Sequence, residues 1–282
     1  MALNNLPDTL GVAVDTLKTA KGEGSGWILH HVLDSNYIEF DPFGKIYLPH
    51  LQLLGMDISI TKNVVFMWLI AILLILLLSL VSGKYKRSLI PKGIVNFFEI
   101  IVLFVRDEIV KPTIGTGYEK FLPYLLTLFF FILAANLIGL VPYSTTVTGN
   151  IAVTAALASI SFIAIQLGGI KKHGFFGYFK GLIPPGMPVL ILPLIVIVEI
   201  LGLFTKPFAL CIRLFANMIA GHVVIFSLIG LIFILKTIFV APVSVGFALF
   251  IYLLELLVAL IQAYIFTMLT ALYIGMAVHQ EH

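Results

Sequence analysis

Residues 64–81 read VVFMWLIAILLILLLSLV, an uncharged run rich in leucine and isoleucine. A helix needs about 20 apolar residues to cross the roughly 30 Å hydrocarbon core of a bilayer, because only its own backbone hydrogen bonds satisfy its amides there. A cluster of basic residues follows at 84–87. The stretch therefore predicts a transmembrane helix over 63–82.

The whole chain has the composition of a membrane protein. Of its 282 residues 60% are hydrophobic and 11% are charged, whereas soluble domains carry roughly a quarter charged residues. The 17 Lys and Arg residues stand against 14 Asp and Glu and lie in short clusters, which argues against a nucleic-acid partner. The lone cysteine, Cys211, excludes an internal disulfide and a thiolate metal cluster. We predict an all-α integral membrane protein with no metal and no cofactor.

Further apolar runs predict transmembrane helices over 121–142 and 150–170. Between the first two spans, residues 91–111 are apolar but interrupted by polar residues three to seven positions apart. This spacing is typical of an amphipathic helix that lies on a membrane surface. Residues 1–62 precede all of these runs as a polar N-terminal segment.

The positions of the basic residues indicate the topology. Segments 83–120 and 171–180 hold 7 and 3 Lys and Arg residues, while the connection 142–150 holds none. Because cytoplasmic loops carry the excess of basic residues, we expect the first two segments on the cytoplasmic side. We interpret 171–180 as a short basic loop, and residues 1–62 then lie outside.

Two much longer apolar stretches occupy the C-terminal part of the chain, over 187–235 and 242–279. At about 1.5 Å per residue the first would extend roughly 70 Å as one helix, more than twice the hydrocarbon thickness. Length and charge leave two interpretations open, two ordinary spans or one steeply tilted helix.

Ionisable side chains are rare in these two stretches, and a charge at the bilayer centre costs about 2.5 to 3.5 kcal/mol, so each marks a candidate site. The candidates and their polar companions are Glu199, Lys206, Arg213, Asn217, His222, Glu255 and Gln262. Arg213 stands out, because a guanidinium with a pKa above about 12 keeps its charge and needs an anionic or aqueous partner. That partner is Glu255, Glu199 or a carboxylate of another chain.

Structural roles are the alternatives for several of these residues. Lys206, directly before Pro207, could reach the membrane interface with its ammonium group, and Glu199 could pair with it. Asn136, inside the predicted helix 121–142, is typical of a hydrogen bond between neighbouring helices. Cys211 is expected to pack, and His173 to be solvated.

The run ALCIRLFANM over 209–218 resembles the signature of subunit a of the F-type rotary ATP synthase. NLIGLVP over 136–142, Glu199, and LIQAYIF over 260–266 extend the resemblance in the same order. Cys211 stands where the family usually has Ser, Thr, Ala or Gly, so the residue stays small. His222 and Glu255 stand where some family members carry Glu and His respectively, which keeps an acid and an imidazole.

The resemblance implies a fold of five transmembrane helices plus one amphipathic surface helix. It implies that the last two stretches form a hairpin of long, tilted helices, each crossing the membrane once. The N-terminus would then lie outside and the C-terminus in the cytoplasm of a multi-pass protein of the bacterial inner membrane.

The resemblance also implies a function. Subunit a forms two proton half-channels against a rotating ring of c subunits, and Arg213 between them would couple proton flow to rotation and ATP synthesis. His222, Glu255 and Gln262 would line the outer half-channel, with Glu199 along it or near it and Asn217 as polar support. The coupling ion is a proton or, as the alternative, sodium.

Implied partners are the c-ring, the peripheral-stalk subunit b, the whole ATP synthase complex and the lipid bilayer. The chain itself is expected not to be an enzyme, since it contains no Gly-x-x-x-x-Gly-Lys-Ser/Thr loop. Two other classes compete. A secondary transporter would bind substrate near the midplane, usually between structural repeats, and a membrane scaffold would use Arg213 and Glu255 as a buried ion pair.

Overall fold

The computed structural model describes residues 37–40, 44–47, 49, 52–53, 56–57, 59–85, 92–141, 144–181, 192–235 and 238–279. Five helices in these ranges are long and apolar enough to cross a membrane. They are α3 (Lys62–Tyr85), α6 (Leu122–Gly139), α7 (Ile151–His173), α9 (Leu192–Leu235) and α10 (Ala241–Val278). The predicted fold class, a helical membrane protein with five spans, is confirmed.

Two short β-hairpins precede the helices. Strands β1 (Tyr37–Phe40) and β2 (Gly44–Tyr47) pair antiparallel, and so do β3 (Gln52–Leu53) and β4 (Met56–Asp57). They lie in the segment that was predicted only to be polar. The rest of the predicted N-terminal segment 1–62 lies largely outside the described residues.

Helix ends follow local sequence signals. Helix α7 begins where the side chain of Asn150 accepts a hydrogen bond from the amide of Ala152 at 2.9 Å, which satisfies one of the free amides of the first turn. It ends at Gly174, whose φ of 74° suits glycine and whose amide donates to Ile170 O at 2.8 Å. The basic stretch predicted as a loop instead forms the last turn of α7 and a further helix, α8 (Phe175–Gly181).

The amphipathic segment is as long as the predicted helix 91–111, but it begins and ends three residues later and is less regular. It consists of α4 (Ile94–Phe104), a π-helical stretch η1 (Val105–Val110) and α5 (Lys111–Ile114). Within α4 only Val95 is buried, while Phe97 and Ile100 are 59% and 57% exposed. In η1 and α5 the buried side chains are Val105, Ile109, Val110 and Ile114.

Contacts between residues divide the chain into two units. One consists of residues 1–63 and 219–255, and the other of residues 64–218 and 256–282. A large buried cluster forms the core of the second unit, and η1, α6, α7, α8, α9 and α10 all contribute to it. Its members include Val105, Ile109, Leu125, Ile132, Ile165, Tyr178, Leu210, Leu214, Phe266 and Ile274.

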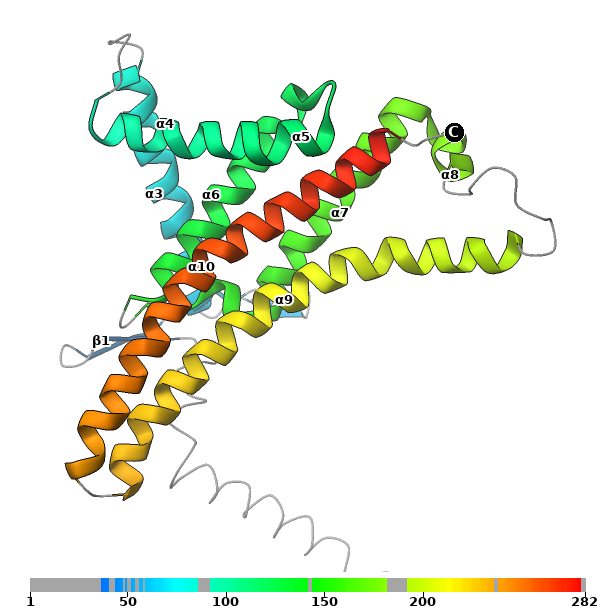
Figure 1. The fold of residues 1–282 in the computed structure, drawn as a ribbon. Helices are drawn as coiled ribbons and strands as arrows, with labels where there is room; N and C mark the ends of the chain where they lie inside the picture. The colour runs from blue at the N-terminus through cyan, green and yellow to red at the C-terminus, as the bar shows by residue number, and fades with distance from the viewer. Residues whose placement is uncertain are drawn as a thin grey trace, which may run out of the picture. The chain divides into compact units, whose positions relative to one another are not determined.

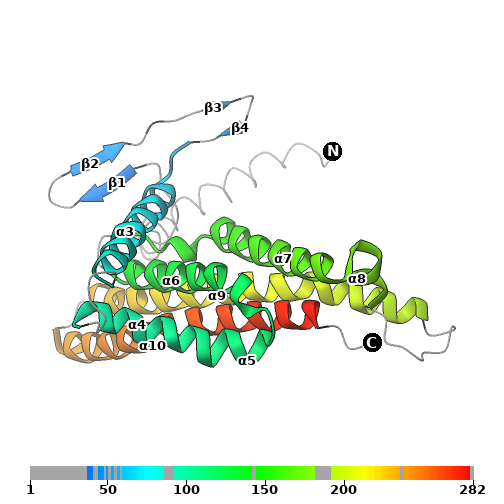
Figure 2. The same ribbon diagram turned by 90° about the horizontal axis from the view of Figure 1, so that it is seen from above.

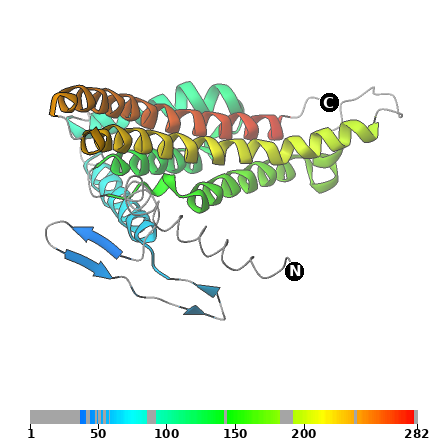
Figure 3. The ribbon, with the colours of Figure 1, turned by 90° about the horizontal axis from the view of Figure 1, so that it is seen from below.

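The first long stretch is a single helix of 44 residues, α9, which at about 1.5 Å per residue extends some 66 Å. Pro207 lies inside it and cannot donate to the carbonyl one turn earlier, and α9 bends in this region (Figure 1). Helices α9 and α10 run side by side in opposite directions (Figures 1 and 3). The interpretation as a hairpin of two long helices is therefore confirmed, and that of two spans within 187–235 is wrong.

Candidate functional site

Arg213 lies on the outward side of α9. Its neighbours Leu210 and Leu214 point into the core with exposures of 2% and 0%, and the helical spacing turns Arg213 outward, where it is exposed. Within residues 64–218 and 256–279, as far as they are described, Arg213 has no ion pair or hydrogen bond. A guanidinium keeps its charge and needs an anionic or aqueous partner, which these described side chains do not supply.

One turn further along α9, Asn217 contacts α10. Its Nδ2 donates a hydrogen bond of 3.0 Å to Oε1 of Gln262. Gln262 is 2% exposed, and its own Nε2 has no hydrogen-bond partner among the described residues. The two amides thus link the helices and leave one buried donor available for a further acceptor.

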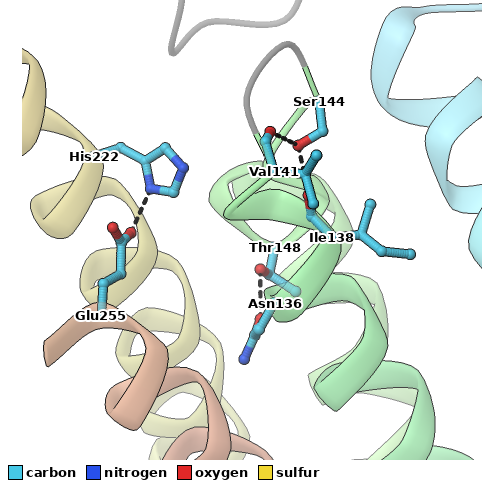
Figure 4. Close-up of polar contacts among 7 residues, drawn as sticks. All are labelled: Asn136, Ile138, Val141, Ser144, Thr148, His222 and Glu255. Atoms are coloured by element: carbon cyan, nitrogen blue, oxygen red, sulfur yellow. Dashed lines mark hydrogen bonds and ion pairs between the residues drawn. The ribbon is translucent and has the colours of Figure 1, made fainter. Parts of the chain in front are cut away.

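The other unit contains a second polar pair between the same two helices. Nδ1 of His222 lies 2.5 Å from Oε1 of Glu255 (Figure 4). The side chain of Glu255 is only 2% exposed and that of His222 is 16% exposed. Because desolvation penalises an isolated carboxylate, the imidazole is the group that stabilises this acid inside the hairpin. The expected acid and imidazole pair therefore exists as a direct contact.

Glycine leaves room beside this pair. A Cβ atom on Gly221 would lie 2.7 Å from Oε1 and 2.8 Å from Cδ of Glu255, closer than carbon atoms pack. Gly221 directly precedes His222, so the absence of a side chain on α9 lets the carboxylate of α10 approach the helix backbone and reach the imidazole.

A third polar contact links α6 to α10 inside the larger unit, which consists of residues 64–218 and 256–282. Nδ2 of Asn136 donates to the carbonyl of Ala259 at 3.3 Å, and Oγ1 of Thr148 donates to Oδ1 of Asn136 at 2.7 Å (Figure 4). Asn136 and Thr148 are both 0% exposed. The interhelical role considered for Asn136 is thus observed, and Ala259 lies three residues before Gln262 on α10.

The side chain of Ser144 bonds to backbone carbonyls at the end of α6 and just after it. Oγ of Ser144 donates to the carbonyls of Ile138 and Val141 at 2.5 and 2.7 Å (Figure 4). Both carbonyls also accept backbone amides, Ile138 O from Val141 and Val141 O from Ser144.

Glu199 belongs to a different place in the same unit, a cavity of about 460 Å³. Helices α7, α8, α9 and α10 supply its walls, and its polar lining residues are Gln166, Tyr178, Glu199, Lys206, Tyr273 and His279. Nζ of Lys206 lies 5.1 Å from the ring centre of Tyr273, a cation–π contact. Among the described residues no ion pair joins Lys206 to Glu199, so the proposed pairing of these two is not observed.

Tyr178 closes one side of this cavity from α8. It is 1% exposed, and burial raises the pKa of its hydroxyl above the ordinary value, while the nearby amide of Gln166 opposes this shift. The ring occupies the space that a Cβ on Gly169 would fill. His173, expected to be solvated, instead has its Nε2 2.9 Å from the carbonyl of Val278.

The sequence identified four of the contacting side chains, Asn217, Gln262, His222 and Glu255, and the structure joins them as two separate pairs. It did not identify Thr148, Gln166 or Tyr273, which are uncharged. Their only signal in the sequence was a polar amide or hydroxyl group, which does not by itself indicate a site. In the described part of the chain, no three His, Cys, Asp or Glu side chains gather as metal ligands would.

The fold and these contacts define a multi-pass membrane protein with ionisable side chains inside its spans. The sequence matches the family described as ATP synthase A chain over residues 64–275. It is 54% identical over 261 residues to ATP synthase subunit a of Chloroherpeton thalassium, which covers 90% of this chain and 77% of that protein. The chain belongs to the ATP synthase A chain family, as the sequence predicted.

Two other relatives extend the similarity. ATP synthase subunit a 2 of Chlorobaculum tepidum is 54% identical over 254 residues, covering 89% of this chain and 72% of the relative. ATP synthase subunit a of Myxococcus xanthus is 52% identical over 229 residues, covering 80% of this chain and 75% of the relative. The matched region includes α9 and α10, where the polar pairs lie.

Proposed function

We propose that this chain acts as subunit a of a rotary ATP synthase, where two half-channels carry protons to and from a rotating ring of c subunits. Family membership supports this role. The observation that carries the residue-level proposal is Arg213, a permanent cation on the exposed side of a long apolar helix, without a partner in the described residues of its own unit.

Arg213 would meet a carboxyl group on each passing c subunit. In lipid that carboxyl stays protonated, because an ion at the bilayer centre is too costly. Beside the guanidinium the carboxylate is stabilised, so the proton leaves into one half-channel and another enters from the second. Since arginine does not release its own proton, protons cannot pass directly between the half-channels, and the ring must turn.

The resemblance to the family assigns His222, Glu255 and Gln262 to the outer half-channel, with Asn217 as polar support. An imidazole titrates near neutral pH, and with its nitrogen 2.5 Å from a buried carboxylate the pair can take up and pass on one proton. Asn217 and Gln262 would hold water or the c-subunit carboxyl in place, since the buried Nε2 of Gln262 lacks an acceptor among the described residues.

The inner half-channel is assigned to the cavity at Glu199. This departs from the expectation that Glu199 lies along or near the outer half-channel. Gly181 lines the cavity and ends the segment that carries Lys171, Lys172 and Lys180, which the excess of basic residues assigns to the cytoplasmic side. A cavity of about 460 Å³ with a carboxylate among its walls has room for water and a group that accepts protons.

The remaining assignments follow from this role. The chain would sit in a bacterial inner membrane with its N-terminus outside and its C-terminus in the cytoplasm. It would contact the c-ring through the exposed face of α9 and the peripheral-stalk subunit b elsewhere. ATP chemistry would take place on other subunits, so the chain itself is not an enzyme.

The test is ATP-driven proton pumping by the complete ATP synthase in inverted vesicles. Arg213→Ala should abolish pumping, and Arg213→Lys should restore little, because lysine can lose its proton and lacks the planar fork of donors. Arg106→Ala is the matched control, since Arg106 is paired with its neighbour Asp107 outside the spans. Pumping retained in Arg213→Ala vesicles would contradict the mechanism. Repeating the assay with and without sodium distinguishes the coupling ion.

A further inference from the structure

Helix α8 turns its aromatic side chains outward. Tyr178 is 1% exposed, whereas Phe175, Phe176 and Phe179 are 58%, 86% and 44% exposed. In a helix these three positions fall within an arc of about 100°, and Tyr178 lies outside that arc. Three phenyl rings gathered on the outside of a seven-residue helix form an apolar surface that water would not stabilise.

Contacts with α7 and α10 hold α8 in place within the larger unit. Tyr178 sits where a Cβ on Gly169 would be, so the glycine provides its space in α7. Gly174, with φ of 74°, makes the sharp turn between α7 and α8, and the bond between His173 Nε2 and Val278 O ties this turn to α10. Figure 2 shows α8 directly at the end of α7. These contacts fix the position of α8, and with it the three phenyl rings, relative to the end of α7.

Basic side chains border the aromatic surface. Lys171 and Lys172 lie in the last turn of α7, Lys180 lies in α8, and all three are exposed. Helix α7 is long and apolar enough to cross a membrane, and its Ile163 and Leu167 are 53% and 60% exposed. Its basic end must then lie where hydrocarbon meets headgroups, which puts the adjoining helix at the same level.

We propose that the outward side of α8, together with Lys171, Lys172 and Lys180, is a binding site for anionic phospholipid. Phe175, Phe176 and Phe179 enter the boundary between acyl chains and headgroups, as aromatic rings of interfacial helices do. The three ammonium groups bind headgroup phosphates, whose charge they complement. This site is separate from the proton path and adds a lipid partner of defined charge.

Continuity with a membrane span favours lipid over a protein partner. A membrane surface is already present at the end of α7, and it offers both the apolar layer and the phosphates that the rings and lysines require. Lysine is depleted in the centres of protein interfaces, yet here three lysines border three exposed rings. The anionic membrane surface therefore fits both halves of the patch.

The test measures tryptophan quenching by brominated lipid. In a full-length parent with Trp27→Phe and Trp68→Phe, Phe176→Trp places one fluorophore on the patch. The protein is reconstituted in phosphatidylcholine vesicles that contain either dibrominated phosphatidylglycerol or dibrominated phosphatidylcholine. We expect quenching by both lipids, about twofold stronger or more with the anionic one, because each nearby lysine favours anionic headgroups.

Charge removal gives the discriminating comparison. Lys171→Gln, Lys172→Gln and Lys180→Gln together should make the two brominated lipids quench equally. The matched control, Lys111→Gln with Lys120→Gln, removes exposed lysines elsewhere and should keep the preference. Phe179→Trp repeats the measurement at a second position in case Phe176→Trp does not fold. Absence of quenching by either lipid means that water or protein covers the patch, and equal quenching before charge removal means no anionic selectivity; either result overturns the proposal.

Discussion

Nδ2 of Asn217 donates to Oε1 of Gln262 at 3.0 Å, one helical turn after Arg213. This bond joins the exposed side of α9 to a glutamine of α10 that is 2% exposed. The rotation of α9 about its axis decides where Arg213 points, so a fixed contact one turn away orients the cation. In the proposed mechanism the pair therefore serves as a support for Arg213 as well as a part of the half-channel.

We expect Asn217 and Gln262 to be energetically coupled. In a double-mutant cycle with Asn217→Ala and Gln262→Ala, the coupling should lie between about 0.6 kcal/mol, the average for interhelical hydrogen bonds in membranes, and about 1.7 kcal/mol, their maximum. Unfolding of the reconstituted chain by denaturant gives the four stabilities, and proton pumping of the same variants gives the functional side. If the effects of the two substitutions were strictly additive for both stability and pumping, the hydrogen bond would contribute to neither.

The pair of His222 and Glu255 should tolerate exchange better than loss. Because one nitrogen and one carboxylate oxygen already lie 2.5 Å apart, the double variant His222→Glu and Glu255→His keeps one acid and one imidazole in contact. We expect it to retain more ATP-driven proton pumping than His222→Ala, which takes the imidazole away from a buried carboxylate, or Glu255→Ala, which removes the acid. Equal loss in the exchange and in the single variants would contradict the coupling.

Gly275→Ala should destabilise the chain. A Cβ at this position would clash with the backbone carbonyl oxygen of Thr113 in α5, and relief requires movement of a whole helix, at a cost of about 1 to 3 kcal/mol. Gly202→Ala is the matched control, because nothing lies within 4 Å of its Cβ position. Thermal unfolding of the two purified variants, followed by circular dichroism, should separate them. Similar midpoints would show that α5 yields easily.

Tyr178 should make the fold sensitive to alkaline pH. Burial raises the pKa of its hydroxyl above the ordinary value of 10.0, so below that pH both the folded and unfolded chains are neutral here and this contribution is complete. As the pH rises further, the unfolded chain ionises first, and stability falls until the folded pKa is passed.

Tyr178→Phe removes this group, so its unfolding midpoint should decline less steeply above pH 10 than that of the parent. Tyr85→Phe serves as the control, since Tyr85 is 53% exposed, and it should leave the slope unchanged. Identical slopes for the parent and Tyr178→Phe would mean that the hydroxyl is solvated in the folded chain.

The helices and the polar pairs could be predicted from sequence to different degrees. Uncharged runs define α3, α6 and α7, because lipid tolerates little else. Hydropathy alone did not determine that α9 is one helix of 44 residues, since a tilted helix and two spans have the same apolar composition. Only the resemblance around Arg213 chose between them.

The residues of the site could be predicted from the sequence, but most of the contacts between them could not. Charged residues in apolar stretches stand out, which identified Arg213, Glu199 and Glu255. The register between two helices depends on how they pack against each other, so the bond from Asn217 to Gln262 could not be predicted from the sequence of either helix. The cavity at Glu199 also depends on Tyr178, which the sequence had assigned to a loop instead of a helix.

Two contacts in the larger unit join α9 to α10, Lys206 to Tyr273 and Asn217 to Gln262. The steps between them are equal and opposite, eleven residues forward on one helix and eleven back on the other, close to three full turns. One residue inserted in either step would swing everything beyond it by about 100°. An insertion or deletion within either interval would therefore break one of the two contacts, whereas a substitution between the contacting residues keeps their spacing.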